Sequence, residues 1–97
     1  MIIDNKFYKM KIEIKTLSAK EKIDEGISSW PIWSCNVSEF DWEYEEQEAC
    51  YLLEGQVEIH SELETVALSA GDFVVFPQGL KCRWKVTRPV RKHYSFR

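Results

Sequence analysis

Three segments of the chain carry side chains that could do chemistry, and within each segment they occupy alternate positions. Alternate residues of a β-strand point to the same face, so this spacing gathers the side chains on one face of each predicted strand. If the three faces converge, a carboxylate, two thiols, a phenol and two indoles lie near one another. The residues are Trp42 and Tyr44, Glu48 and Cys50, and Cys82 and Trp84.

Glu48 is the candidate general acid or base of this set, because a carboxylate in a pocket can exchange protons with a ligand. A buried carboxylate is costly unless it is hydrogen-bonded or paired, and Tyr44 or a tryptophan indole N–H could serve as its partner. Two interpretations stay open: a structural acid satisfied inside the fold, or a catalytic acid or base. No second catalytic partner is evident, which favours a binding or structural role.

Cys50 and Cys82 allow two further interpretations. If they face each other, they could form a thiol pair or a soft metal site, provided that their Cα atoms lie within about 7 Å. Otherwise they are buried free thiols that pack as small hydrophobic groups. The three cysteines are an odd number without the short spacing of a metal motif, which predicts free thiols in a reducing compartment, the cytoplasm.

The elements that position these residues begin with one strand and one helix. Residues 9 to 17 alternate between charged and apolar side chains, which predicts a strand with one buried face. The following segment predicts a helix from Ala19 to Glu25. Ser18 and Glu21 form a capping box at its start, and Gly26 stops it. The apolar side chains of the strand are Met10, Ile12 and Ile14.

From position 30 onward, short strands and turn residues alternate along the chain, which favours an antiparallel sandwich or a closed barrel. Pro31, near the start of the aromatic stretch Trp30 to Trp33, predicts an edge strand or an extended arm. Glu54-Gly55 predicts a hairpin turn, and Pro89 separates the last two predicted strands. The glycines expected to adopt positive φ angles or crowded backbone positions are Gly71 and Gly79.

The spacing of glycine and proline resembles the motifs of the cupin superfamily, whose members are small jelly-roll barrels. The second cupin motif begins with Gly, five residues and Pro-x-Gly, and GDFVVFPQG matches it. The first motif has a Glu seven positions before a Gly, as Glu48 and Gly55 have in EACYLLEG. The segments WPIW, FDWEY, CYLLEG, GDFVVFP, GLKCRWKV and VRKHY together look like the small single-domain cupins grouped with ureidoglycine aminohydrolase-like domains. The resemblance implies an all-β, antiparallel jelly-roll barrel with one short N-terminal helix, in a single domain over residues 1–97.

The resemblance also shows where this chain departs from the family. The histidines of the first motif would fall at Trp42 and Tyr44, or at the acidic residues 41 and 43, and the histidine of the second motif would fall at Cys82. Of the metal ligands in the two cupin motifs, this chain keeps only Glu48. One carboxylate and one thiolate do not make the usual transition-metal site, which takes three or more protein ligands. The chain is therefore expected to hold no His-ligated metal and no cofactor. The cupin register that the resemblance implies points the six candidate residues, from Trp42 to Trp84, into the barrel.

Bulk composition excludes several classes of protein. The net charge of -3 lacks the basic excess of a nucleic-acid binder. No segment approaches the length of a membrane span, and the start Met1 to Asp4 lacks the apolar run of a signal peptide. A local group of basic residues near the C-terminus is expected to form a solvated outer face. Its members are Lys81, Arg83, Lys85, Arg88, Arg91, Lys92 and Arg97.

Three functions fit these observations. The first is metal-free binding of, or action on, a small polar metabolite in an aromatic-lined pocket around Glu48. The second is a metal-dependent hydrolase of the aminohydrolase-like kind that the resemblance implies. The third is a non-enzymatic homodimer in which the arm Trp30 to Trp33 packs between subunits, with a core-covering strand as the alternative for the same segment.

Overall fold

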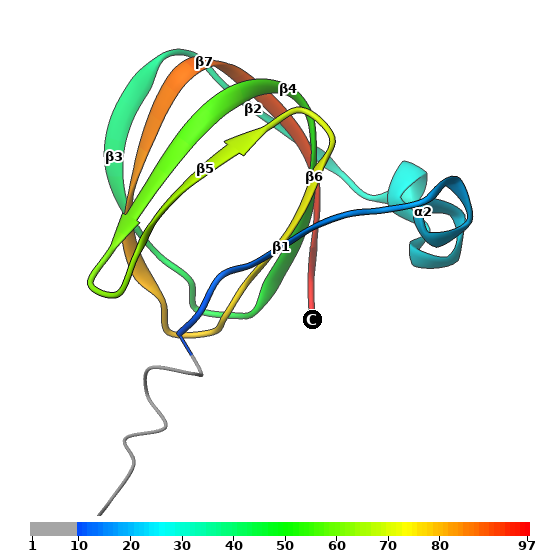
Figure 1. Ribbon diagram of the computed structural model, residues 1–97, viewed down its shortest axis with the longest axis horizontal. Coiled ribbons are helices and arrows are strands. Elements are labelled where there is room, and N and C mark those ends of the chain that lie inside the picture. The colour runs from blue at the N-terminus through cyan, green and yellow to red at the C-terminus, as the bar shows by residue number, and fades with distance from the viewer. Residues whose placement is uncertain (1–9) are drawn as a thin grey trace, which may run out of the picture.

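The structure, a computed structural model, describes residues 10–97, which form seven strands and one α-helix. Most of these residues lie in strands, and every strand pairing is antiparallel, as the sequence predicts (Figure 1). The elements in chain order are β1 (Glu13–Thr16), α2 (Ala19–Glu25), the 3-10 turn η1 (Ile27–Ser29), β2 (Ile32–Cys35), β3 (Ser38–Glu43), β4 (Glu48–Ser61), β5 (Thr65–Ser69), β6 (Asp72–Phe76) and β7 (Lys81–Phe96).

The strands form one curled sheet in the order β1-β6-β4-β7-β2. β5 pairs with β4, and β3 pairs with β7, so each of these two long strands has partners on both sides. In Figure 1 the strands curve around a common interior, and α2 lies outside it. Within the described residues, β1 and β2 end the sheet without pairing to each other, so hydrogen bonds do not close the predicted barrel.

β4 and β7 pair with each other through a bend where the register shifts between residues 52 and 57. The predicted hairpin at Glu54-Gly55 is wrong, because β4 runs through these residues. The predicted separation at Pro89 is wrong as well, because β7 runs through the proline. A glycine inside a strand pattern marks a bulge as readily as a turn, and the irregular pairing at this bend is where a proline is tolerated.

Gly55 allows this bend, because its backbone has a φ of 103° and faces the opposite strand closely. A Cβ atom at this position would lie 2.5 Å from the carbonyl oxygen of Pro89 and 2.6 Å from the Cα of Val90. The two strands therefore approach more closely than any side chain would permit. Gly71 and Gly79 have φ angles of 95° and 88°, which confirms the prediction for these two turns.

The helix α2 has the predicted bounds and caps. The Ser18 side chain accepts a hydrogen bond from the backbone N–H of Glu21, whose carboxylate accepts one from the backbone N–H of Ser18. Gly26 ends the helix in the left-handed conformation with a φ of 72°. These three residues satisfy backbone groups that the helix itself leaves unpaired at its ends.

The strand before the helix is shorter than predicted. Ile12 is buried, but it precedes β1, and Ile14 is 40% exposed. The predicted buried face is therefore wrong at Ile14, where β1 is an edge strand with β6 as its one partner in the described residues. Two predictions lie outside the described residues. They are the start of this strand at residue 9 and the lack of a signal peptide, which rests on Met1 to Asp4.

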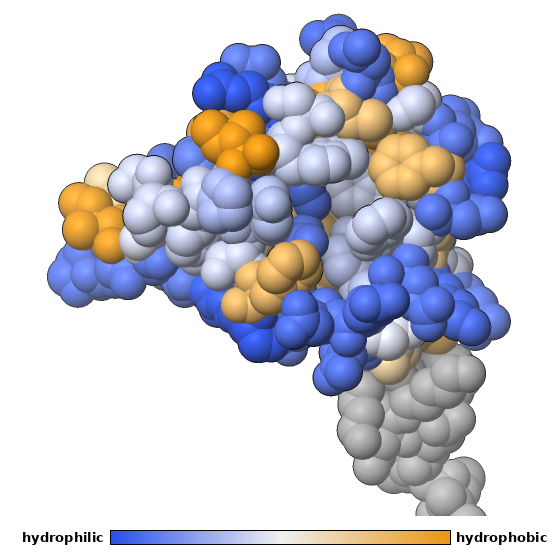
Figure 2. All heavy atoms as spheres, turned by 180° about the vertical axis from the view of Figure 1, so that it is seen from behind, coloured by the Kyte–Doolittle hydropathy of each residue, from blue (hydrophilic) through white to orange (hydrophobic). Residues whose placement is uncertain are grey.

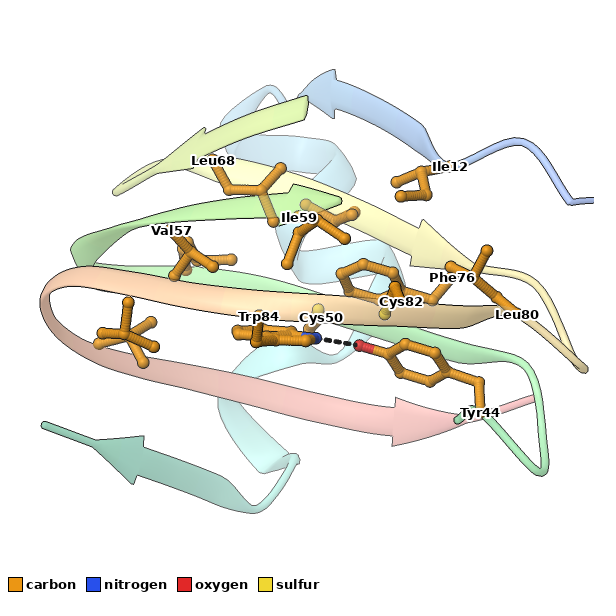
Figure 3. Packing of buried hydrophobic residues seen from close by; sticks show 14 residues of the cluster. Ile12, Tyr44, Cys50, Val57, Ile59, Leu68, Phe76, Leu80, Cys82 and Trp84 are labelled. Atoms are coloured by element: carbon orange, nitrogen blue, oxygen red, sulfur yellow. Dashed lines mark hydrogen bonds between the residues drawn. The ribbon is translucent and has the colours of Figure 1, made fainter. Parts of the chain in front are cut away.

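The buried side chains form two clusters. The larger one fills the interior of the curled sheet, and Figure 3 shows Trp84, Phe76, Ile59 and their neighbours pointing into it. The smaller cluster packs Phe73 and Ala49 against Leu17 and Ile27 from the segments that flank α2. The interior is therefore lined by the strands that carry the candidate residues.

The outer surface is mixed in character. On the face shown in Figure 2, apolar residues occur as separate groups among polar ones. β2 forms an edge of the sheet, as predicted for the stretch Trp30 to Trp33, and its packing between two copies stays a prediction. No helix of the described residues is both long enough and apolar enough to span a membrane.

Candidate functional site

A cavity of about 220 Å³ lies on the inner side of β2, β3, β4 and β7. Aromatic side chains make up most of its lining, and one acidic and one basic side chain are the charged groups among them. The lining residues are Trp33, Phe40, Trp42, Tyr44, Glu48, Trp84, Lys92, Tyr94 and Phe96. A mostly apolar cavity with a few polar groups is the usual form of a small-molecule site.

The two charged groups of the cavity form a buried ion pair. The Nζ of Lys92 donates a hydrogen bond of 2.7 Å to Oε2 of Glu48. Their side chains are only 7% and 8% exposed. Burying two charges is costly, and a close pair with a direct hydrogen bond offsets much of that cost. Glu48 is thus held by Lys92 and not by the predicted tyrosine or indole partner.

The ammonium of Lys92 also lies in a cage of aromatic rings. Its Nζ is 4.8 Å from the ring centre of Trp84, 5.2 Å from that of Trp33 and 5.9 Å from that of Phe76. The negative faces of aromatic rings attract a cation at such distances, and the attraction is stronger away from water. The cage and Glu48 together hold the ammonium in position at the wall of the cavity.

Lys92 was assigned to the solvated basic face, and this prediction is wrong for that residue. Neighbouring residues of a strand point to opposite faces, so Arg91 and Lys92 cannot both face solvent. Val90 is buried and Arg91 is exposed, which places Lys92 inside. Three exposed residues at the Pro89 bend interrupt the alternation that begins at Cys82, but Val90 and Lys92 keep its phase. The basic character of the segment, and not the spacing, concealed the inward position.

The polar groups of Tyr44 and Trp84 form a hydrogen bond with each other in the buried wall of the cavity. The indole Nε1 of Trp84 donates a hydrogen bond of 3.1 Å to the hydroxyl oxygen of Tyr44 (Figure 3). The ring of Tyr44 also stacks on Phe76 at 4.5 Å between ring centres. Burial raises the pKa of Tyr44 well above its usual value, and the charge of Glu48 raises it further, so the phenol stays neutral.

The predicted pocket residues divide into two groups. Trp42, Tyr44, Glu48 and Trp84 line the cavity, and the Trp42 residue is 52% exposed. The buried residues Cys50 and Cys82 do not line it, although both belong to the main core cluster. Cys82 instead lines a separate, more open groove beside Asp41 and His60. The prediction that Cys50 and Cys82 line the pocket with Glu48 is therefore wrong for this cavity, whereas both cysteines do face the interior of the sheet. The lining residues that the sequence reasoning missed are Trp33, Phe40, Lys92, Tyr94 and Phe96.

Both core cysteines are free thiols with raised pKa values. Burial raises the pKa of Cys50 to about 12 and that of Cys82 to about 11, and the charge of Lys92 opposes both shifts. The thiolate is the nucleophilic form of cysteine, so a raised pKa leaves these thiols inert at neutral pH. The structure thus favours the small hydrophobic role over a reactive pair.

We expect iodoacetamide to label only Cys35 in the folded protein at neutral pH, because this thiol is partly exposed while the other two are buried. Intact-mass measurement should show one adduct, and three after denaturation. The matched control is Cys35→Ser, which should take no label while folded. Rapid labelling of this variant at the pH of an ordinary thiol pKa, about 8.5, would contradict the burial of Cys50 and Cys82.

The residues present do not fit the metal centre that the cupin motifs imply. Of the motif positions, Glu48 and Cys82 carry possible ligands that are buried, whereas Asp41 and Glu43, at the alternative first-motif positions, are exposed. No group of three or more His, Cys, Asp or Glu side chains within residues 10–97 could hold a metal ion. The ammonium of Lys92 also occupies an oxygen of Glu48 that a metal would need. Transition-metal sites usually take three or more protein ligands, so this donor set is insufficient.

Comparison with known proteins places this geometry in a family. Residues 23–94 match the family model of the EutQ-like cupin domain. A DUF861 family protein from Thermotoga maritima is 44% identical to the chain, covering 90% of this chain and 100% of that one, with a TM-score of 0.88. None of the curated proteins matches the chain.

A more distant structure shares the fold. The EutQ protein of Clostridium difficile is 23% identical, with a TM-score of 0.61. The match covers 86% of this chain and 64% of that protein, so it shows a shared fold only. The family match extends from within α2 through nearly all of β7 and so includes every lining residue of the cavity except Phe96. The chain belongs to the cupin superfamily, in the family of EutQ-like cupin domains.

Proposed function

We propose that this cupin binds a small polar metabolite in the aromatic cavity, through Lys92 and Glu48 and without a His-ligated metal. The ion pair that lines the cavity carries the proposal. A buried ion pair is seldom the most stable filling for a core, since apolar residues of similar volume are often as good or better. A pair placed at the wall of a cavity, with 7% and 8% exposed side chains, is better explained by a ligand that uses it.

The aromatic walls support the same proposal. Phe40 and Trp84 are stacked with an interplanar angle of 10°, and Trp33 meets Trp84 edge-on at 74°. Rings held by each other in this way keep their positions without a ligand, which lowers the entropy cost of binding. Such walls supply apolar contact area, while the two charged groups supply orientation.

The test is a thermal-shift and NMR screen of small amides, carboxylates, amines and sugars against the wild-type protein. We expect at least one class to raise the melting temperature and to shift the indole resonances of Trp33 and Trp84. The double variant Lys92→Met with Glu48→Gln should remain folded and lose this response. Arg83→Met is the matched control, because Arg83 pairs with Glu39 and Asp41 on the surface and does not line the cavity. If no compound binds, or if the double variant binds equally well, the proposal fails.

The narrower likeness to ureidoglycine aminohydrolase-like domains is a second proposal for the same site. It rests on the motif residues in EACYLLEG and GDFVVFPQG and on Glu48, which lines the cavity as a candidate general acid or base. In this proposal the carboxylate, with Lys92 as its proton-bearing neighbour, would act directly on the bound ligand. Ammonia release from ureido or amino compounds measures it, and Glu48→Gln should abolish the release.

A further inference from the structure

The charges and hydrogen-bonding groups of the cavity narrow the chemistry of its ligand. Resting on the binding function proposed above, we infer that the ligand is a neutral, planar molecule with an amide-type edge. Its carbonyl oxygen accepts a hydrogen bond from Lys92, and its neighbouring N–H or O–H group donates one to Glu48. Primary amides, ureas and lactams belong to this class.

The lining of the cavity has no net charge. Lys92 and Glu48 contribute one positive and one negative charge, and they are the charged residues of the lining. Their sum is zero, so the cavity offers no net charge to attract an ion. An ionic ligand would leave water for an aromatic enclosure without a free counter-ion, and burying an unpaired charge is costly. A neutral ligand avoids this cost.

Glu48 and Lys92 both keep hydrogen-bonding capacity beyond the bond that joins them. The Glu48 carboxylate accepts a hydrogen bond at Oε2 from Lys92, and the Cys50 thiol lies close enough to interact with the same ion pair. No fully buried side-chain oxygen of the described part lacks a partner, so the other oxygen, Oε1, keeps some accessible surface. Glu48 lines the cavity, which makes the cavity the space that Oε1 can face. An ammonium has three donors, and Lys92 uses one of them on Glu48. The cavity therefore presents an acceptor next to a donor.

A ligand matches this arrangement when it carries a donor and an acceptor side by side. The ammonium of Lys92 lies 2.7 Å from Oε2 of Glu48, and Oε1 belongs to the same carboxylate, so the free donor and the free acceptor are neighbours. A carboxylate has two acceptors and would face the carboxylate of Glu48 with one of them. An amidinium has only donors and would face the ammonium of Lys92. The amide edge is complementary at both positions.

The walls and the volume of the cavity limit the shape and the size of a ligand. Tyr44 and Phe76 are nearly parallel at 7°, as are Phe40 and Trp84 at 10°, and both pairs contribute a ring to the lining. Flat walls favour a flat ligand that stacks on them. A volume of about 220 Å³ corresponds to roughly seven water molecules at about 30 Å³ each, which admits a single small ring or a short planar chain.

Three compounds of nearly equal shape test the inference: benzamide, benzoate and benzamidinium. They are neutral, anionic and cationic at neutral pH, and their dissociation constants are measured by NMR titration of the wild-type protein. We expect benzamide to bind at least about tenfold more tightly than either ion. Acetamide, acetate and acetamidinium repeat the comparison without the ring, so that poor fit of the ring cannot be mistaken for poor fit of the edge.

Two variants reverse the preference if the ion pair sets it. Glu48→Gln leaves Lys92 as an uncompensated cation, and benzoate should then bind most tightly. Lys92→Met leaves Glu48 as an uncompensated anion, and benzamidinium should then bind most tightly, with near-UV circular dichroism to confirm the fold. Because Glu48→Gln keeps the caged lysine, it preserves the test if Lys92→Met is too unstable to measure.

The outcomes separate this inference from the proposed function. Tighter wild-type binding of benzoate or benzamidinium, or an unchanged order of the three compounds in Glu48→Gln, would overturn the inference and leave the cavity as a binding site. Failure of both series, while other compounds from the screen bind, would also overturn the inference. Absence of binding by every compound of the screen would overturn the proposed function itself.

Discussion

Replacing Lys92 with methionine is expected to lower the free energy of unfolding by about 4 kcal/mol, because it leaves the buried carboxylate of Glu48 without a partner. Methionine keeps most of the apolar stem, so packing against Trp84 and Trp33 changes little. The loss arises from the missing charge at 2.7 Å from Oε2 and from the missing cation over the rings. Urea unfolding followed by tryptophan fluorescence measures the change.

The double variant Lys92→Met with Glu48→Gln should recover most of this stability, since replacing both members of a buried pair by neutral groups is often neutral or stabilising. Lys20→Met is the surface control. Lys20 pairs with Asp24 at 3.0 Å, but their side chains are 87% and 59% exposed, so its loss should cost under about 0.5 kcal/mol. A Lys92→Met protein within about 1 kcal/mol of the wild type would mean that Glu48 is not truly cut off from water.

Gly55→Ala is expected to destabilise the protein by about 3 kcal/mol or more, because steric strain and backbone strain act together. The new Cβ would lie 2.5 Å from the Pro89 carbonyl oxygen, and both the oxygen and the Val90 Cα behind it belong to backbone that pairs in the sheet. The φ of 103° adds a conformation that alanine rarely adopts. Urea unfolding gives the change in free energy, and an unchanged slope would confirm a folded-state effect.

Gly71→Ala separates the two contributions. Gly71 has a φ of 95°, but nothing lies within 4 Å of a Cβ built on it, so this variant carries backbone strain without a clash. We expect it to cost about 1 to 2 kcal/mol. If both variants lose the same amount, the close approach of β4 and β7 at Gly55 contributes nothing, and the explanation of the bend is wrong.

The local elements of the fold were predictable from the sequence, because their signals are local. The capping box at Ser18 and the stop at Gly26 define α2 within a few neighbouring residues. The turn at Gly71 is likewise a property of its own segment. Gly55 stands in a similar local sequence, but its role depends on its close approach to Pro89, in a strand far along the chain. No local pattern distinguishes such a bulge from a hairpin turn.

The candidate site was predictable for the residues that follow the cupin spacing and strand alternation. Glu48, Tyr44 and Trp84 could be placed inside in this way. Lys92 has the same strand phase as Trp84, but its residue type pointed the other way. A lysine among other basic residues has the character of a surface residue, and buried lysines are rare. Closure of the barrel depends on whether the edge strands β1 and β2 meet, which is a tertiary property that strand periodicity does not report.

The shared position of β4 and β7 in the sheet would govern how a ligand of the proposed kind reaches the cavity. Every strand except β1 pairs directly with one of these two, and the bend at Gly55 lets the same pair support both halves of the curled sheet (Figure 1). The two halves therefore have no hinge between them, and parting them would break the central ladder. Entry and exit then depend on side-chain rotation at the rim, where the lining residues Trp42 and Phe96 are 52% and 55% exposed. Opening of the rim is accordingly expected on the nanosecond scale of rotamer motion, faster than the microseconds or longer that domain opening takes, so that access to the cavity would not limit ligand exchange.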